Sequence, residues 1–152
     1  MALSIPKPKP VWEDRFAIPS VDALRDDLSK QSLALVDHLR TTILSVQGVK
    51  ESVAWCGPSW KWSVVFKDNA GRIVAYIVPQ PAHTKLVLPI STHILSRLPS
   101  REVSKWMRDG ITAATAVGDI RWAHWEFQSK ANIEELLWLL EARLPSLAIQ
   151  SS

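Results

Sequence analysis

The run from Trp60 to Phe66 constrains the fold more than any other part of the chain. Its side chains alternate, with large apolar residues at positions 60, 62, 64 and 66 and mostly polar residues between them. Successive side chains of a β-strand point to opposite faces, so this period of two predicts a half-buried strand that presents Trp60 and Trp62 to the same side. Half-buried strands are typical of antiparallel sheets.

Turn residues and further apolar runs extend this strand into a meander. The segment 68–71, Asp-Asn-Ala-Gly, suits a tight turn because Asn and Gly tolerate positive backbone angles. Strands are then predicted over 72–78 and over 84–88, and Pro89 is expected to end the latter because proline cannot donate to a ladder. One more strand is predicted upstream, over 51–55. The centre of the chain is therefore an antiparallel meander.

Helices are predicted on both sides of the meander from apolar spacings of three and four and from capping residues. A long N-terminal helix is expected from Ser20 to Gly48. The elements after the meander are, in order, a short helix from Ser91 or Thr92 to before Pro99, a helix from Ser100 to Gly118, a strand over 119–127 and a helix from Ser129 or Asn132 to Pro145. Helices segregated beside an antiparallel sheet predict a two-layer α+β domain with about five strands.

Length and composition indicate one domain. The 152 residues suffice for a sizeable core, and we predict a Pro-rich extended arm over 1–19, a single α+β domain over 20–147 and a frayed tail over 148–152. A single cysteine and the lack of a signal-peptide-like or membrane-spanning apolar run predict a soluble cytoplasmic protein. The net charge of +3 is too small to favour nucleic acid as a partner.

Three short motifs make the segment 20–145 resemble uncharacterised small bacterial α+β families of the YdhG/YjbR type. They are Trp55-x-Gly-x-x-Trp-x-Trp62, Ala75-Tyr-Ile-Val-Pro-x-Pro81 and Leu86-Val-Leu-Pro89. The resemblance implies a compact single domain, often dimeric, with no established enzymatic role. Some YdhG-type proteins are linked to iron handling, and the YjbR type has been suggested to bind DNA. This chain shows neither the acidic helix surface nor the strongly basic face that those roles require.

The segment 55–59, Trp-Cys-Gly-Pro-Ser, resembles the thioredoxin motif with Ser59 in place of the second cysteine. Redox chemistry at such a motif needs a low-pKa thiolate at a helix N-terminus and a resolving thiol three residues later. The resolving thiol is missing, and the residues that follow alternate like a strand. We therefore predict that Cys56 is not a catalytic thiol. It is expected to be a structural residue or to lie in an exposed turn.

His124 and Glu126 lie two positions apart on one predicted strand face, where such a pair could bind a metal or move protons. The other histidines have no ligand spacing to this pair, so we expect an exposed polar pair and no metal site. The chain also lacks a Gly-rich phosphate loop and a nucleophile elbow. We predict no catalytic residue and no cofactor.

The eight tryptophans are the most informative feature, because so many large rings are hard to bury in one small domain. Some should line a cleft or an interface, and Trp122 and Trp125 should point to opposite faces of their strand. The candidate contact residues are Trp55, Trp60, Trp62, Tyr76, His83 and Trp125.

Together these features predict a non-enzymatic binding or interaction domain. Its sheet is expected to carry a Trp-rich cleft for a small apolar or aromatic ligand, or a surface for a protein partner or a second copy in a homodimer. One alternative is a small enzyme or redox protein that uses Cys56 or the pair of His124 and Glu126. Another is weak nucleic-acid binding through the hairpin at 67–72.

Overall fold

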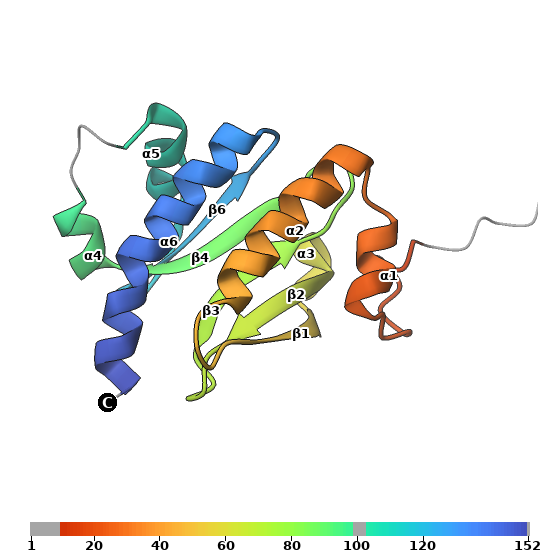
Figure 1. Cartoon of the computed structure of the whole chain (residues 1–152), viewed down its shortest axis with the longest axis horizontal. Coiled ribbons are helices and arrows are strands. Elements are labelled where there is room, and N and C mark those ends of the chain that lie inside the picture. The colour runs from red at the N-terminus through yellow and green to blue at the C-terminus, as the bar shows by residue number, and fades with distance from the viewer. Residues whose placement is uncertain (1–9, 99–102, 152) are drawn as a thin grey trace, which may run out of the picture.

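An open six-stranded antiparallel sheet forms the centre of the molecule in the computed structural model, which describes residues 10–98 and 103–151 (Figure 1). The strands are β1 (Lys50–Trp55), β2 (Trp62–Lys67), β3 (Ile73–Val78), β4 (Lys85–Ser91), β5 (Thr115–Val117) and β6 (Ile120–Glu126). Their order in the sheet is β1-β2-β3-β4-β6-β5. The first four strands pair in chain order, which confirms the predicted meander.

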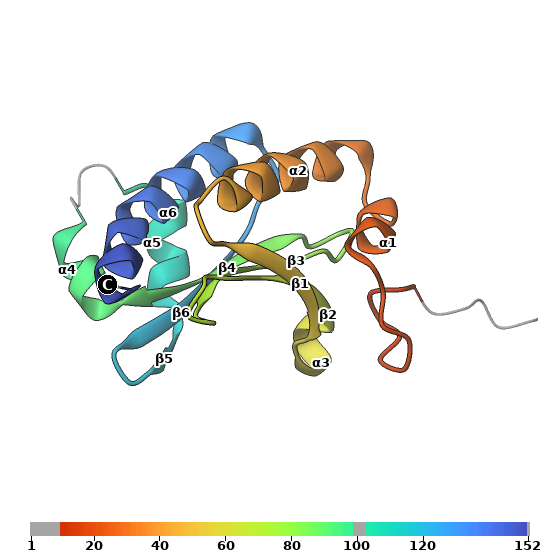
Figure 2. The ribbon, with the colours of Figure 1, turned by 60° about the horizontal axis from the view of Figure 1, so that its bottom comes forward.

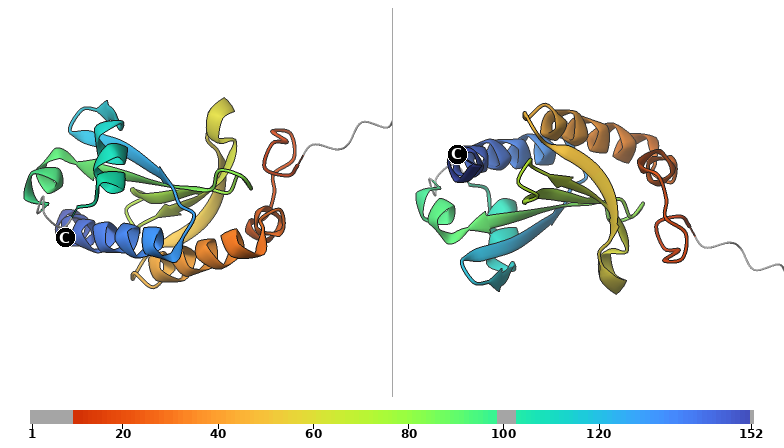
Figure 3. Two further views of the ribbon diagram at one scale, coloured as in Figure 1. Left: turned by 90° about the horizontal axis from the view of Figure 1, so that it is seen from above. Right: turned by 90° about the horizontal axis from the view of Figure 1, so that it is seen from below.

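The two longest helices cover one face of this sheet (Figure 2). The helices of the described residues are α1 (Val21–Asp26), α2 (Lys30–Leu44), α3 (Gly57–Trp60), α4 (Thr92–Arg97), α5 (Lys105–Thr112) and α6 (Lys130–Ser151). The helices α2 and α6 lie over the same face, while α3 and the β5–β6 hairpin project from the opposite side (Figure 2). The helix α1 lies at the other end of the molecule from α4 (Figure 3). The predicted α+β class is confirmed.

The core lies between the sheet and the helices. One buried row crosses four strands and consists of Val64, Ile77, Leu86 and Trp125. The helices α2 and α6 supply Leu39 and Leu136, which are also fully buried in this cluster. Because side chains alternate along a strand, the next row of residues faces away from the helices.

The N-terminal helix predicted over 20–48 is divided in two. Ser20 caps α1 as predicted, but Ser29 caps α2, where its hydroxyl accepts a hydrogen bond from the first turn at 3.2 Å. A serine side chain that bonds the local backbone offers an alternative to continued helix, so Ser29 marks a new start. Arg25 joins the two helices, since its guanidinium donates to both carboxylate oxygens of Asp37 at 2.8 and 2.7 Å.

Pro89 does not end the third strand of the meander as predicted. The strand β4 continues to Ser91 and pairs with β6 from Lys85 onwards. Its pairing with β3 stops at Val87, so the rest of β4 is paired on one side only. A proline fits such a position because it has no N–H to leave without a partner on the unpaired side.

The helix predicted from Ser100 to Gly118 is a shorter helix followed by a strand. Ser100 lies outside the described residues, and α5 begins after Ser104, whose hydroxyl caps it. The chain then forms β5, which pairs with β6 through a turn at Gly118, where φ is +61°. Thr115 and Val117 favour this strand because they are β-branched. The sheet therefore has six strands and not the predicted five.

The last helix starts as predicted and ends later. The Ser129 hydroxyl accepts from the Asn132 N–H at 3.2 Å, and the Asn132 side-chain oxygen accepts from the Gln128 N–H at 3.0 Å. These two bonds satisfy donors at the start of α6 in the manner of a capping box. The helix then runs to Ser151, past Pro145, where it was predicted to end. No helix in the described part of the chain is long and apolar enough to cross a membrane.

Candidate functional site

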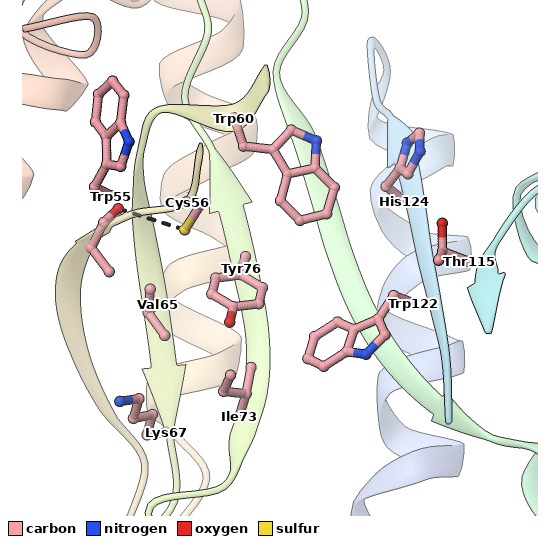
Figure 4. Close-up of a pocket in the computed structure, with 11 residues that line it drawn as sticks. Trp55, Cys56, Trp60, Val65, Lys67, Ile73, Tyr76, Thr115, Trp122 and His124 are labelled. Carbon is pink, nitrogen blue, oxygen red and sulfur yellow. Dashed lines mark hydrogen bonds between the residues drawn. The ribbon is translucent and has the colours of Figure 1, made fainter. Parts of the chain in front are cut away.

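A cleft of about 550 Å³ lies on the face of the sheet that α2 and α6 leave uncovered (Figure 4). Its floor includes Val65, Tyr76 and His124, which belong to one cross-strand row that alternates with the core row. The other residues that line it are Ala54 and Trp55 of β1, Cys56 before α3, Trp60 of α3, Lys67 of β2, Ile73 of β3, Thr115 of β5 and Trp122 of β6.

Four rings form a connected cluster across this cleft, which we call the aromatic cluster: Trp60, Tyr76, Trp122 and His124. The centroid of Trp60 is 6.4 Å from that of Tyr76 and 6.1 Å from that of His124, and Tyr76 is 5.8 Å from Trp122. The interplanar angles of 41° to 73° are tilted or edge-on. Such arrangements are the favourable ones for aromatic pairs, so the rings hold one another in place.

Trp60 reaches the cleft because a helical turn interrupts the alternation of the sequence. Trp60 ends α3, and Lys61 follows with φ of +56°, before β2 starts at Trp62. The turn is closed by hydrogen bonds between Cys56 N and Lys61 O and between Lys61 N and Gly57 O, both 2.7 Å long. The prediction that Trp60 and Trp62 share a strand face is therefore wrong, because Trp62 enters the core and is only 7% exposed.

Neighbouring segments hold this turn from two sides. The Gln80 side-chain amide donates to the Ser59 carbonyl at 2.8 Å. On the other side, the Lys61 ammonium lies 3.4 Å from the Glu13 carboxylate and 5.4 Å from the centroid of Trp12. The turn that carries Trp60 is thus anchored before any ligand arrives.

The indole N–H groups separate core tryptophans from cleft tryptophans. The indole of Trp62 donates to the Asp14 carbonyl at 2.6 Å, and that of Trp125 donates to the Met107 carbonyl at 3.2 Å. Within the described residues, the indoles of Trp60 and Trp122 have no acceptor. A buried tryptophan N–H normally has a partner, as those of Trp62 and Trp125 do. The N–H groups of Trp60 and Trp122 have no such partner in the described part of the chain and are available to a ligand.

The predicted contact residues divide between cleft, core and rim. Trp60 and Tyr76 line the cleft, whereas Trp62 and Trp125 lie in the core. Trp55 borders the cleft, but its ring turns away from the aromatic cluster (Figure 4). That ring packs edge-on against the Trp62 ring at 5.7 Å, and the Arg15 guanidinium lies 6.0 Å from its centroid. These positions follow from the register, because Trp55 and Trp62 are cross-strand partners.

The prediction omitted Trp122, which contributes one of the largest rings of the cleft. Trp122 and Trp125 do point to opposite faces as predicted, but Trp125, the predicted contact residue of the two, lies in the core, and Trp122 lines the cleft. The sequence of β6 held the signal. The residues two positions before and after Trp125, Ala123 and Phe127, are both apolar, although Arg121 shares their face, while the face of Trp122 carries the polar residues 124 and 126.

Cys56 lines the cleft at the start of α3. The prediction that no helix follows it was wrong, but α3 has only four residues, and the Cys56 side chain makes no capping bond to it. Burial raises the pKa of the Cys56 thiol, and a side-chain hydrogen bond with Ser63 opposes this rise only in part. The Sγ atom lies 3.6 Å from the Ala54 carbonyl. The thiol is therefore protonated near neutral pH, unlike the thiolate of a redox motif.

We expect Cys56 to react with iodoacetamide at pH 7 about ten-fold more slowly than a free cysteine, because the thiolate is the reacting species and burial disfavours it. Mass spectrometry over time measures the rate. The same protein in guanidinium chloride is the control and should react at the rate of free cysteine. Fast alkylation of the folded protein, or rapid formation of a mixed disulfide with glutathione, would contradict this expectation.

His124 and Glu126 do not form a pair. Glu126 instead lies beside His83 of the β3–β4 loop, with 2.9 Å between His83 Nδ1 and a carboxylate oxygen. His83, a predicted contact, is thus engaged at the surface and does not line the cleft. Partial burial and the charge of Lys85 lower the pKa of His124, so its imidazole is neutral near pH 7. In the described part of the chain, no group of three or more His, Cys, Asp or Glu residues could hold a metal ion.

In the hairpin at 67–72, Arg72 forms an ion pair with a carboxylate of the same hairpin. The Arg72 guanidinium donates to the Asp68 carboxylate at 2.9 Å, and the same carboxylate accepts from the backbone N–H groups of Ala70 and Arg72. This pairing reduces the positive charge that the hairpin presents to a nucleic acid.

Comparison with known proteins finds no family model that matches this chain and no curated protein that matches it. The resemblance to the YdhG/YjbR type stays a prediction, and the function has to be inferred from the cleft.

Proposed function

We propose that this protein is a non-enzymatic binding domain that holds a small molecule with a flat aromatic or apolar body in the cleft. The observation that carries the proposal is the aromatic cluster, in which the rings of Trp60, Tyr76 and Trp122 line a cleft of about 550 Å³. Ligand sites typically measure about 300–1,000 Å³ and combine apolar walls with a few polar groups.

The polar groups of the cleft also suit a ligand. The indole N–H groups of Trp60 and Trp122 and the hydroxyl of Tyr76 have no partner among the described residues, although their rings are partly buried. A ligand that accepts hydrogen bonds would satisfy donors that the fold leaves unused. Such donors orient a ligand while the ring faces supply contact area.

The rigidity of the cleft supports binding without a large rearrangement. The α3 turn is anchored by Gln80 and by Glu13, and the aromatic cluster packs against itself. A preformed site loses little conformational entropy when the ligand binds. The alternative of an enzyme has less support, because the thiol of Cys56 is protonated and Glu126 is paired with His83.

Titration with 2-naphthalenemethanol, followed through the indole N–H signals in a nitrogen–proton correlation spectrum, tests the proposal. We expect saturable shifts of the Trp60 and Trp122 signals with a Kd of about 0.1–1 mM, as fits a ligand of this size. Trp60→Leu should weaken binding at least about five-fold by removing one ring face.

Trp138→Leu is the matched control, because Trp138 is a partly buried tryptophan on α6 that does not line the cleft. It should leave the affinity unchanged. A lack of saturable shifts, or equal losses of affinity in the Trp60 and Trp138 variants, would refute the cleft as the binding site.

A further inference from the structure

We propose that the ligand of this cleft carries a negatively charged group, such as a carboxylate, held by Lys67 and the hydroxyl of Tyr76. The inference rests on the proposed function of the cleft as a small-molecule site. It adds the charge of the ligand and the direction in which the ligand lies.

The two groups belong to the same end of the cleft. Lys67 is the last residue of β2 and lines the cleft together with Ile73. The Tyr76 hydroxyl points along β3 toward this end, away from Trp60 and Cys56 (Figure 4). A flat body over the rings of the aromatic cluster would therefore place a substituent near both Lys67 and the Tyr76 hydroxyl.

The positive charge of Lys67 is not balanced by a neighbouring negative charge among the described residues. Lys67 is exposed and forms no ion pair with any residue that the structure describes. Its direct partner across the β1–β2 pair is Lys50, which is also exposed. Like charges directly opposite each other in a sheet are destabilising, and an anion beside them would relieve the repulsion.

The cleft contains no negative charge to compensate these lysines. None of the described residues that line it is acidic. The nearest carboxylates of β6 and of the hairpin are engaged elsewhere, since Glu126 lies against His83 and Asp68 binds Arg72. His124 is neutral near pH 7 because partial burial and Lys85 lower its pKa. A cationic ligand could stack on the rings, but Lys67 would repel it.

Tyr76 supplies a hydrogen bond to the same group. Burial raises the pKa of its hydroxyl, so the group keeps its proton at neutral pH. A protonated hydroxyl donates to a carboxylate, and hydrogen bonds to charged acceptors are about twice as strong as neutral ones. Lys67 and Tyr76 thus provide one charge and one directed donor.

Three probes of one shape test the inference: 2-naphthoate, the neutral 2-naphthalenemethanol and the cationic 2-naphthylmethylammonium. At low ionic strength we expect naphthoate to bind about ten-fold more tightly than the alcohol, and the ammonium probe to bind more weakly than either. Lys67→Met should bring naphthoate to the affinity of the alcohol while leaving the alcohol unchanged. Tyr76→Phe should lower the affinity for naphthoate more than that for the alcohol.

Lys130→Met is the matched control, because it removes the same charge from an exposed position on α6. It should preserve the preference for naphthoate. Equal affinities for all three probes, or a preference that survives Lys67→Met, would overturn the inference and leave the cleft as a site for neutral ligands. Failure of all three probes to bind would overturn the proposed function and this inference with it.

Discussion

Replacing Gly110 with alanine should lower the free energy of unfolding by about 2–3 kcal/mol, although alanine favours a helix over glycine by about 1 kcal/mol. Gly110 lies inside α5, and a methyl group there would meet the Trp125 ring, whose Cδ1 and Cε2 atoms would be 2.6 Å away. The indole cannot move away easily, because Trp125 is only 2% exposed and its N–H donates to the Met107 carbonyl. Urea denaturation followed by circular dichroism measures the loss.

The control for helix propensity is Thr112→Ala, at the exposed end of the same helix, which should change stability by less than about 0.5 kcal/mol. A double-mutant cycle isolates the contact itself. In a Trp125→Leu background the ring is gone, so Gly110→Ala should cost much less there than in the wild type. A Gly110→Ala protein as stable as the wild type would show that the helix and the indole can move apart.

Trp125→Leu should mainly reduce stability, whereas Trp122→Leu should mainly reduce ligand binding, although the two tryptophans lie on the same strand. Trp125→Leu should cost about 2–4 kcal/mol of stability, because it leaves a cavity in the core and removes the donor to Met107. Trp122→Leu should cost about 1 kcal/mol, since this ring is only partly buried. It should nevertheless weaken binding of 2-naphthoate at least about ten-fold by removing a wall of the cleft.

Denaturation curves and probe titrations on the same two proteins measure both effects. Trp125→Leu, examined below its midpoint of unfolding, should bind the probe nearly as tightly as the wild type. If both variants lose stability equally and bind equally, the two faces of β6 do not differ in the way that their burial indicates.

Local signals in the sequence predicted most elements of the fold. The alternation in 62–66 and the turn at 68–71 predicted the central hairpin, and Ser91 and Ser129 predicted the starts of α4 and α6. The errors occurred where tertiary pairing decided the outcome. Pro89 is tolerated because β3 no longer pairs with β4 there, which no local pattern reveals.

The candidate site was harder to predict because the sheet face on which a side chain lies depends on the residue at which its strand begins. The alternation continues backwards through residue 60, but the positive φ of Lys61 and the α3 turn separate Trp60 from the strand. The period alone therefore placed Trp60 and Trp62 together. The opposite faces of Trp122 and Trp125 were predicted, whereas the face that is covered by helices depends on the packing of α5 and α6.

The alternation of the sheet also bears on how the specificity of such a domain can change. Core residues alternate with residues of the cleft face along β6, and Tyr76 of β3 lies between the core residues Ala75 and Ile77. These strands therefore offer positions that can be varied without changing the packing beneath the helices. Substitutions at 76, 122 and 124 would reshape the cleft, while their neighbours in sequence keep the fold intact. The scaffold therefore lends itself to divergence, with one backbone able to serve ligands of different shape and charge.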